Sequence, residues 1–195
     1  MTHFLPSVLQ DQAFYLSGGG SVAPYRIPRH YRPWLLDTGS LTQRLVKASQ
    51  GAFEVELLRL GHQQTTALER DALSLPQRNW PFLREVALKC HDQPWVFART
   101  VIPNTTLQGP ARALTHLGTK PLGAVLFNHP GVRRGPISVL RIDASRVSRT
   151  FANQGLIWGR QSVFYLLGKP LLVSEYFLHQ CPMYNRPSMT SNDYT

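Results

Sequence analysis

The sequence predicts an α+β fold, a single domain in which antiparallel strands alternate with short helices. In several segments apolar residues recur at every second position, which is the periodicity of strands. Short turns join some of these segments, and helical segments with start and stop residues lie between others, an order typical of α+β domains. The 195 residues are 43% hydrophobic, enough for one core, and no internal repeat or linker divides them.

The predicted helices are short and begin at recognisable capping residues. The hydroxyl of Ser40 can accept a hydrogen bond from the first helical turn while Gln43 reaches back, as in a capping box, and Gly51 suits the end of this helix. Its apolar stripe consists of Leu41, Leu45 and Val46. Further helical segments are expected at residues 71–75, 111–117 and 122–127, the latter two begun by prolines.

The predicted strands follow from the alternation of apolar and polar residues. They cover residues 53–57, 82–90, 95–102, 137–142, 156–167 and 171–178. The turn at residues 91–94 is expected to join the second and third of these strands as a hairpin. A second turn, at residues 168–170, joins the last two strands.

The two ends of the chain differ in composition from its middle. Residues 1–33 are rich in Pro, Gly and Ser and are expected to form an irregular arm, residues 34–184 the folded domain, and residues 185–195 a flexible polar tail. The N-terminus has no basic region followed by an apolar one, and no apolar run approaches the ~18 residues of a membrane span. We therefore expect a cytoplasmic protein without membrane contact. Cys90 and Cys181 cannot form a disulfide framework, which fits a reducing compartment.

The chain carries a formal net charge of +10. Such an excess favours an anionic partner, which can be nucleic acid, a membrane surface or a small anionic substrate. The basic residues are scattered apart from Arg26, Arg29 and Arg32 and the pair Arg133–Arg134, and no zinc-finger spacing, RNA-binding aromatic motif or basic helix is present. Nucleic-acid binding therefore stays an alternative that rests on charge.

The seven histidines lack metal-binding spacing, so no metal site is expected.

Ionisable side chains share faces with apolar residues in the predicted strands, because alternate residues of a strand point the same way. They are Arg84, Arg99, Arg160 and Glu175. Trp95, for instance, is expected on the face of Arg99. An unpaired charge in an apolar interior costs several kcal/mol, so these groups either pair with one another or reach water, or they line a pocket. The surplus of arginine over glutamate favours an anionic ligand, because arginine makes two parallel hydrogen bonds to a carboxylate.

Short motifs in a fixed order and spacing extend from about Trp34 to Tyr184. They are Trp34-Leu35-Leu36, Ser40-Leu41-Thr42-Gln43-Arg44, Leu83-Arg84-Glu85, Pro94-Trp95, Ala98-Arg99-Thr100-Val101-Ile102-Pro103, Thr106-Leu107, Gly109-Pro110, Leu117-Gly118, Pro121-Leu122-Gly123, Leu126-Phe127, Trp158-Gly159-Arg160-Gln161-Ser162, Gly168-Lys169-Pro170-Leu171-Leu172, Ser174-Glu175-Tyr176-Phe177-Leu178 and Pro182-Met183-Tyr184. As an ordered set, they resemble the chorismate pyruvate-lyase family.

The resemblance implies a six-stranded antiparallel sheet with helical flaps that enclose a buried ligand site. It also implies conversion of chorismate to 4-hydroxybenzoate and pyruvate for quinone biosynthesis, without metal or organic cofactor. Arg84 would face the ring carboxylate and Glu175 the ring hydroxyl, and both would be catalytic. Backbone groups of Leu41 and Leu122 would complete the site, with Arg99 close by for the second carboxylate or the ether oxygen.

Two departures from the family pattern and one rival function accompany this interpretation. Leu41 stands where we expect Met, and Ala98 stands where we expect Gly, so the pocket wall differs while every charged group is retained.

The rival function is that of a non-catalytic domain of the same fold that binds a small aromatic acid, as in bacterial transcription regulators. Those regulators carry a separate DNA-binding segment, and residues 1–33 are too often broken by prolines to form one. We expect a monomer, since no heptad pattern or long apolar edge is evident.

Overall fold

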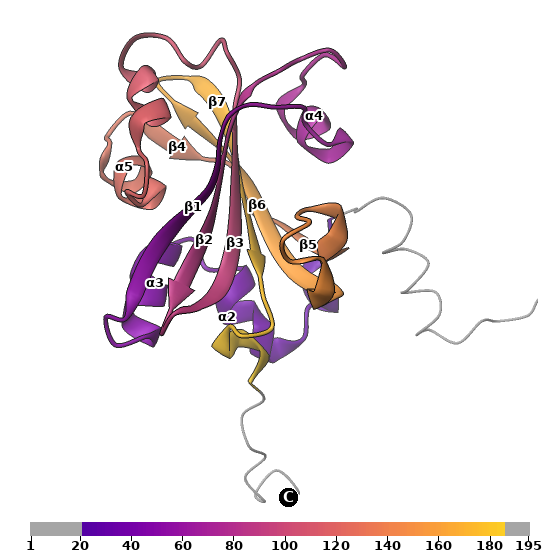
Figure 1. Ribbon diagram of the computed structural model, residues 1–195. Helices are drawn as coiled ribbons and strands as arrows, with labels where there is room; N and C mark the ends of the chain where they lie inside the picture. Colours follow the sequence, from indigo (N-terminus) through magenta and orange to yellow (C-terminus); the bar gives the residue numbers. More distant parts are fainter. Residues whose placement is uncertain (1–20, 186–195) are drawn as a thin grey trace, which may run out of the picture.

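The computed structural model describes residues 21–185, and an antiparallel sheet forms its centre (Figure 1). The sheet has seven strands in the order β1-β2-β3-β7-β6-β4, with β5 also paired to β6. The strands are β1 (Phe53–His62), β2 (Phe82–Cys90), β3 (Gln93–Ile102), β4 (Val132–Arg134), β5 (Ser138–Asp143), β6 (Leu156–Leu166) and β7 (Lys169–Phe177). Every pairing is antiparallel, which confirms the predicted α+β class.

The number of strands differs from the six that the resemblance implies. The additional strand, β4, spans only three residues, too few for an alternating pattern to reveal it. It pairs with the end of β6, while β5 pairs with the first half of β6. Two short strands therefore share this edge of the sheet, and β4 carries Arg134 beside Phe164 of β6.

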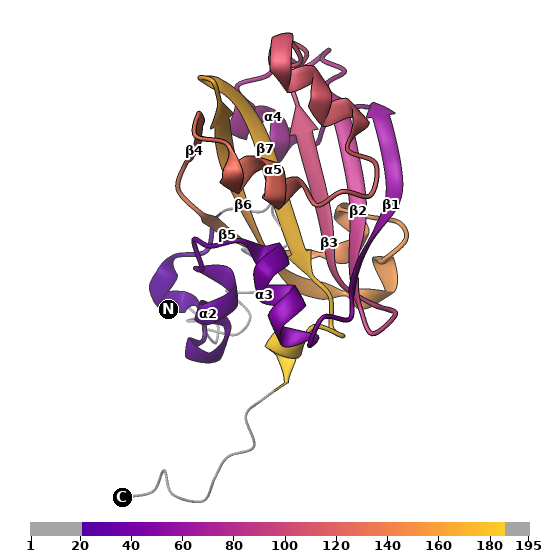
Figure 2. The same ribbon diagram turned by 90° about the vertical axis from the view of Figure 1, so that its left-hand side faces the viewer.

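Helices cover both faces of the sheet. Figures 1 and 2 show α3 (Leu41–Ala48) and α5 (Leu122–Asn128) on one face and α4 (Ala67–Leu73) on the other. The short α2 (Arg32–Leu35) precedes α3. Segments of 3-10 helix complete the described chain, at Pro24–Arg26, Arg29–Tyr31, Gly109–His116, Ala144–Arg146, Ala152–Gln154 and Pro182–Tyr184. Within residues 21–185, no helix has the length and apolar character needed to cross a membrane.

Helix α3 begins where the sequence predicts. Ser40 Oγ accepts a hydrogen bond from the backbone N–H of Gln43, at 3.4 Å, and Gly51 ends the helical segment by donating to the carbonyl of Val46. Gly51 has φ +92, a conformation that glycine adopts without strain. Val46 is 39% exposed, so it lies outside the apolar stripe in which it was expected.

Helix α4 begins earlier than the predicted turn at residues 71–75. Thr66 and Glu69 form a complete capping box, in which Thr66 Oγ1 accepts from the N–H of Glu69 and the Glu69 carboxylate accepts from the N–H of Thr66. The helix therefore starts at Ala67 and ends at Leu73. This cap places Glu69, which is 2% exposed, against the sheet.

The hairpin of β2 and β3 has a tighter turn than predicted and an irregular register. His91 and Asp92 form the turn with φ values of 50° and 60°, so β3 already begins at Gln93. The register shifts between Leu88 and Lys89. Trp95 consequently packs in the same buried cluster as Val86, instead of sharing the face of Arg99 as predicted.

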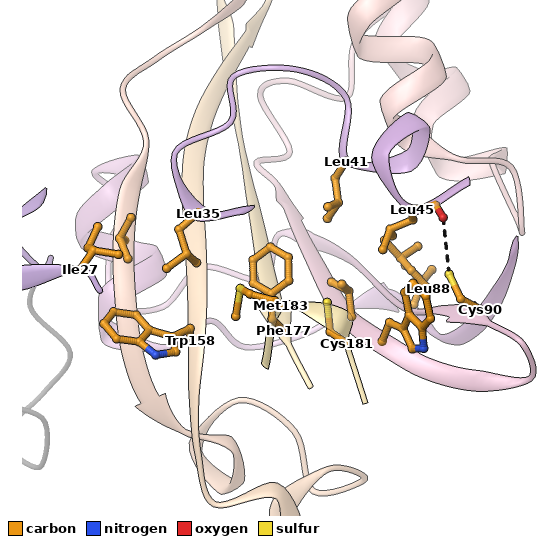
Figure 3. Packing of buried hydrophobic residues seen from close by; sticks show 14 of the residues in the cluster. Ile27, Leu35, Leu41, Leu45, Leu88, Cys90, Trp158, Phe177, Cys181 and Met183 are labelled. Atoms are coloured by element: carbon orange, nitrogen blue, oxygen red, sulfur yellow. Dashed lines mark hydrogen bonds between the residues drawn. The ribbon is translucent and has the colours of Figure 1, made fainter. Parts of the chain in front are cut away.

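The N-terminal part of the described chain belongs to the core. Val22 and Ile27 are 3% and 1% exposed, and the backbone N–H of Val22 donates to the carbonyl of Val139. Figure 3 shows Ile27 in the same cluster as Leu35 and Trp158. The packed domain thus begins before the boundary expected at residue 34, and residues 1–20 of the expected arm and 186–195 of the expected tail lie outside the described residues.

Candidate active site

A cavity lies between one face of the sheet and the helices α3 and α5. Residues of β1, β2, β3, β6 and β7 form its floor, and residues of α3 and α5 line it from the other side. Its lining residues are Leu41, Thr42, Val55, Arg84, Val86, Leu88, Ala98, Thr100, Pro121, Leu122, Gly123, Leu126, Phe164, Val173 and Glu175. Most of these side chains are apolar, so the charges of Arg84 and Glu175 stand out in the cavity wall.

Arg84 is a buried cation without a carboxylate partner among the described residues. It is 3% exposed, and its Nε and Nη2 donate to the carbonyl of Gly118 at 3.2 and 2.9 Å, while Nη2 also donates to the carbonyl of Lys120 at 2.9 Å. Burial lowers the pKa of Arg84. Nη1 makes no hydrogen bond to any residue from 21 to 185, so two N–H groups are available to an anion in the cavity.

Glu175 is held in place by an arginine of the neighbouring strand. Arg160 Nε contacts Glu175 Oε2 at 2.6 Å, and Arg160 Nη1 donates to the carbonyls of Trp34 and Asp37 at 2.9 and 2.7 Å. Arg160 is 1% exposed. The pair therefore joins β6, β7 and the chain before α3. Oε1 of Glu175 accepts no hydrogen bond within the described part of the chain, and Glu175 is one of the residues that line the cavity.

The register of the sheet sets the separation of Arg84 and Glu175. Arg84 pairs with Thr100, and Glu175 pairs with Ala98, two residues away along β3. With ~4.8 Å between strands and ~3.4 Å per residue, the two Cα atoms lie about 12 Å apart. Their side chains thus approach a bound molecule from two sides. This arrangement suits a largely apolar ligand with an anionic group at one end and a hydrogen-bond donor at the other.

Leu41 and Leu122 lie where the sequence predicts that backbone groups meet the ligand. Each is the first residue of its helix and lines the cavity. Backbone N–H groups of a first helical turn have no acceptor within the helix. Contact of these two amides with a ligand stays a prediction. Ala98 also lines the cavity, so its methyl group narrows the space that glycine would leave.

Arg99 does not join the other predicted residues, and this corrects its expected position beside the substrate. Its neighbours Ala98 and Thr100 line the cavity, so Arg99 points to the opposite face of β3. There its Nε contacts Glu69 Oε1 at 2.5 Å, and its Nη1 is hydrogen-bonded to Glu85 Oε1. These two glutamates hold Arg99 between the sheet and α4, where it lines a second cavity.

Arg134 is an additional cation near the first cavity that sequence reasoning noted only as half of the pair Arg133–Arg134. Its Nε donates to Ser162 Oγ at 3.1 Å, and its Nη1 donates to the carbonyl of Thr38 at 3.1 Å. Its guanidinium lies 5.2 Å from the ring centre of Phe164, which lines the cavity. Burial and the charge of Arg160 lower the pKa of Arg134, against the opposing effect of Glu175.

The described residues offer no set of metal ligands. No group of three or more His, Cys, Asp or Glu side chains gathers within residues 21–185. Cys90 and Cys181 are buried free thiols, and burial raises the pKa of Cys181 to about 12. Neither cysteine lines the first cavity. The groups available for chemistry there are therefore Arg84, Glu175 and hydroxyl or backbone groups.

Comparison with known proteins gives matches over most of the chain. The chorismate lyase family model matches residues 25–189. A probable chorismate pyruvate-lyase of Pseudomonas aeruginosa is 43% identical over 145 residues, which cover 74% of this chain and 81% of that protein. A chorismate pyruvate-lyase of Pectobacterium atrosepticum is 40% identical over 166 residues, 84% of this chain and 85% of that protein.

Solved structures give a more distant match. The ligand-binding domain of a putative GntR-family transcriptional regulator from Bordetella bronchiseptica aligns with a TM-score of 0.48 and 18% identity. The alignment covers 66% of this chain and 86% of that chain.

Proposed function

This chain belongs to the chorismate lyase family, and we propose that it converts chorismate to 4-hydroxybenzoate and pyruvate in the cavity beneath α3 and α5. It is an enzyme, a carbon–oxygen lyase. The observation that carries the proposal is Arg84, a buried cation with no carboxylate partner among the described residues, in a largely apolar cavity that also contains Glu175. A buried charge of this kind is stabilised by an anionic ligand.

Arg84 binds the carboxylate of the substrate ring in this proposal. The Nη1 group of Arg84 donates to the carboxylate, while Nε and Nη2 stay on the carbonyls of Gly118 and Lys120. Those carbonyl contacts hold the guanidinium in one orientation before the substrate arrives, so little side-chain entropy is lost on binding. The apolar walls formed by Val86, Leu88 and Val173 accommodate the ring.

The reaction is an elimination that forms an aromatic ring. The bond between the ring carbon and the ether oxygen breaks, and its electron pair leaves with the oxygen as enolpyruvate. The neighbouring hydroxyl-bearing carbon loses its hydrogen as a proton, and enolpyruvate gains a proton to become pyruvate. Aromatisation supplies much of the driving force, so the protein acts chiefly by orientation and charge stabilisation.

Glu175 has two possible roles in this reaction, and both use the oxygen that Arg160 leaves free. It either accepts a hydrogen bond from the ring hydroxyl, or it accepts the departing proton as a general base. Arg160 fixes the orientation of the carboxylate in both cases.

The protein is proposed to act as a cytoplasmic monomer on this small molecule, without cofactor, nucleic acid or membrane, and its product is proposed to enter quinone biosynthesis.

The test is to incubate the purified full chain with chorismate. 4-Hydroxybenzoate is followed by chromatography and pyruvate by a coupled assay, with Arg84→Gln as the matched variant. We expect equimolar formation of both products by the wild type and a large loss in the variant. If no product forms but 4-hydroxybenzoate raises the melting temperature of the wild type, the protein is a binding domain of the same fold. No product and no thermal shift would contradict both functions.

A further inference from the structure

The proposed substrate carries two carboxylates, and only one of them is accounted for by Arg84. The second belongs to the enolpyruvyl group, which is attached to the ring carbon next to the hydroxyl-bearing carbon. If the hydroxyl lies at Glu175, the second carboxylate must also lie at that end of the cavity. The cation that binds it therefore has to be within reach of Glu175 and must not be fully used by protein acceptors.

Three arginines besides Arg84 are candidates for binding the second carboxylate. Arg99 lies on the opposite face of the sheet and is occupied by Glu69 and Glu85. Arg160 lies at the correct end, but its charge is already paired with Glu175, and its Nη1 donates to the carbonyls of Trp34 and Asp37. The remaining one is Arg134.

Arg134 stands at the same end of the cavity as Glu175. It donates to the carbonyl of Thr38, the residue after Asp37, to whose carbonyl Arg160 donates. The two guanidinium groups therefore converge on consecutive peptide units. Arg134 also donates to Ser162, which pairs with Val173 in the sheet and so shares the cavity face of β6 and β7.

The hydrogen bonds of Arg134 leave part of its guanidinium unused. Nε and Nη1 each have one acceptor, and Nη2 has none within residues 21–185. Its face rests on Phe164, which lines the cavity, so the guanidinium is held in a fixed plane next to the cavity wall. A guanidinium with one fixed edge and free N–H donors can bind a carboxylate without first losing its anchoring contacts.

The ion pairs around the cavity support the same assignment. Glu175 is paired with Arg160, and Asp37 is paired with Arg44 at 2.8 Å. Among the described residues around the cavity, the arginines left without an ion pair are Arg84 and Arg134. One of these cations lines the cavity and the other lies beside it, near Glu175. Two such cations without ion pairs match the two carboxylates of a dianion.

We propose that Arg134 binds the carboxylate of the enolpyruvyl group and thereby distinguishes substrate from aromatic product. The inference rests on the proposed function. When the ether bond breaks, the second carboxylate leaves with pyruvate, so Arg134 loses its partner while Arg84 keeps the ring carboxylate. Arg134 therefore contributes to binding of the substrate and the transition state but not of 4-hydroxybenzoate.

The experiment compares chorismate turnover with product binding in Arg134→Gln. We expect kcat/KM for chorismate to fall ~10- to 100-fold, as for loss of a charged hydrogen-bonded pair, while the Kd of 4-hydroxybenzoate changes less than about threefold. Arg134→Lys retains a charge and should recover part of the loss. The matched control is Arg133→Gln, which removes an equal charge from an exposed neighbour that packs on Tyr165 and should change both values much less than Arg134→Gln does.

The ratio of the two effects separates recognition from a structural role. If Arg134→Gln weakened product binding as strongly as it lowered kcat/KM, Arg134 would only hold β4 against the chain before α3, and the proposal would be wrong. Wild-type kcat/KM in folded Arg134→Gln would also overturn it. A wild-type chain that formed no product at all would instead contradict the proposed function itself.

Discussion

At the scale of single residues, Arg84 is a buried cation whose charge an anionic ligand would balance. We expect Arg84→Gln to lower kcat/KM for chorismate ~100-fold or more, and to weaken binding of 4-hydroxybenzoate by a similar factor. The physical reason is that charge-assisted hydrogen bonds to the ring carboxylate are lost from both complexes. Steady-state kinetics and calorimetric titration with 4-hydroxybenzoate measure the two effects.

A lysine at the same position provides the control for this prediction. Arg84→Lys retains a positive charge but not the planar fork that contacts Gly118 and Lys120 and is proposed to bind the ligand at the same time. It should therefore recover only part of the loss. Circular dichroism and the melting temperature show whether each variant is folded. Wild-type turnover in folded Arg84→Gln would contradict the assignment of the cavity as the active site.

Glu175 allows its two possible roles to be separated by one substitution. Glutamine has the same size and retains an acceptor oxygen, but it cannot take up a proton at neutral pH. If Glu175 acts as a general base, Glu175→Gln should lower kcat ~100-fold or more while the Kd of 4-hydroxybenzoate changes far less. Equal losses in kcat and in product binding would assign Glu175 to positioning the hydroxyl.

The stability of this variant is a necessary control, because Arg160 is 1% exposed and loses its ion pair. Breaking a buried pair by neutralising one partner costs ~3–5 kcal/mol. Kinetics are therefore measured well below the melting temperature of the variant. A cooperative thermal transition verifies that the loss of turnover is not a loss of fold.

Residues of the site differ in how far the sequence reveals them. Arg84 and Glu175 lie in long strands with regular alternation, so their position on an apolar face could be predicted. The same alternation puts Arg99 on the opposite face of β3 from Thr100, which pairs with Arg84. Periodicity leaves Arg99 either in an ion pair or in a pocket, and the family resemblance placed it near the ligand. Arg134 could not be identified, because a strand of three residues has no measurable period and its partners Thr38 and Ser162 are distant in sequence.

At the scale of elements, Arg99 connects α4 to the sheet. Its guanidinium binds Glu69 of α4 and Glu85 of β2, and Glu69 is 2% exposed. We expect Arg99→Gln to lower the free energy of unfolding by ~3 kcal/mol, because it leaves the buried carboxylate of Glu69 without its cation. The Kd of 4-hydroxybenzoate should stay unchanged, since Arg99 faces away from the first cavity. Urea denaturation and ligand titration test the two statements.

Arg59→Gln is the matched control for this prediction. Arg59 contacts Glu85 at 3.3 Å, but its side chain is 57% exposed. An exposed ion pair contributes at most ~1 kcal/mol, so the control should change stability much less than Arg99→Gln. If Arg99→Gln weakened 4-hydroxybenzoate binding while stability was retained, Arg99 would belong to the ligand site after all.

The elements that were predicted well are those whose boundaries depend on local signals. Ser40 marks the start of α3, and Gly168 lies in the turn between β6 and β7, because caps and turns act over a few residues. Helix α4 is an exception, because its start also has a local signal, the capping box of Thr66 and Glu69, which the predicted turn at residues 71–75 leaves out. The bulge at Leu88 and Lys89, which moves Trp95 to the other face, depends on the pairing of two strands and has no signature within either one.

At the scale of the whole molecule, the net charge of +10 acts on a substrate with two negative charges. Long-range attraction raises the rate of encounter, and salt screens it because the Debye length falls from ~30 Å at 0.01 M to ~3 Å at 1 M. We expect kcat/KM for chorismate to fall steadily as NaCl is added, while kcat changes little because the bound complex is already formed. Steady-state kinetics at constant pH measure both parameters across the salt series.

Arg133→Gln again serves as the comparison in this salt series, since it removes one exposed charge outside the site. It should reduce the slope of kcat/KM against salt slightly and leave the value at high salt unchanged. A kcat/KM that does not respond to salt would show that the basic surface plays no part in capture. A fall in kcat with constant KM would instead place the effect of salt inside the cavity, on the ion pair of Arg160 and Glu175 or on the arginines that hold the dianion.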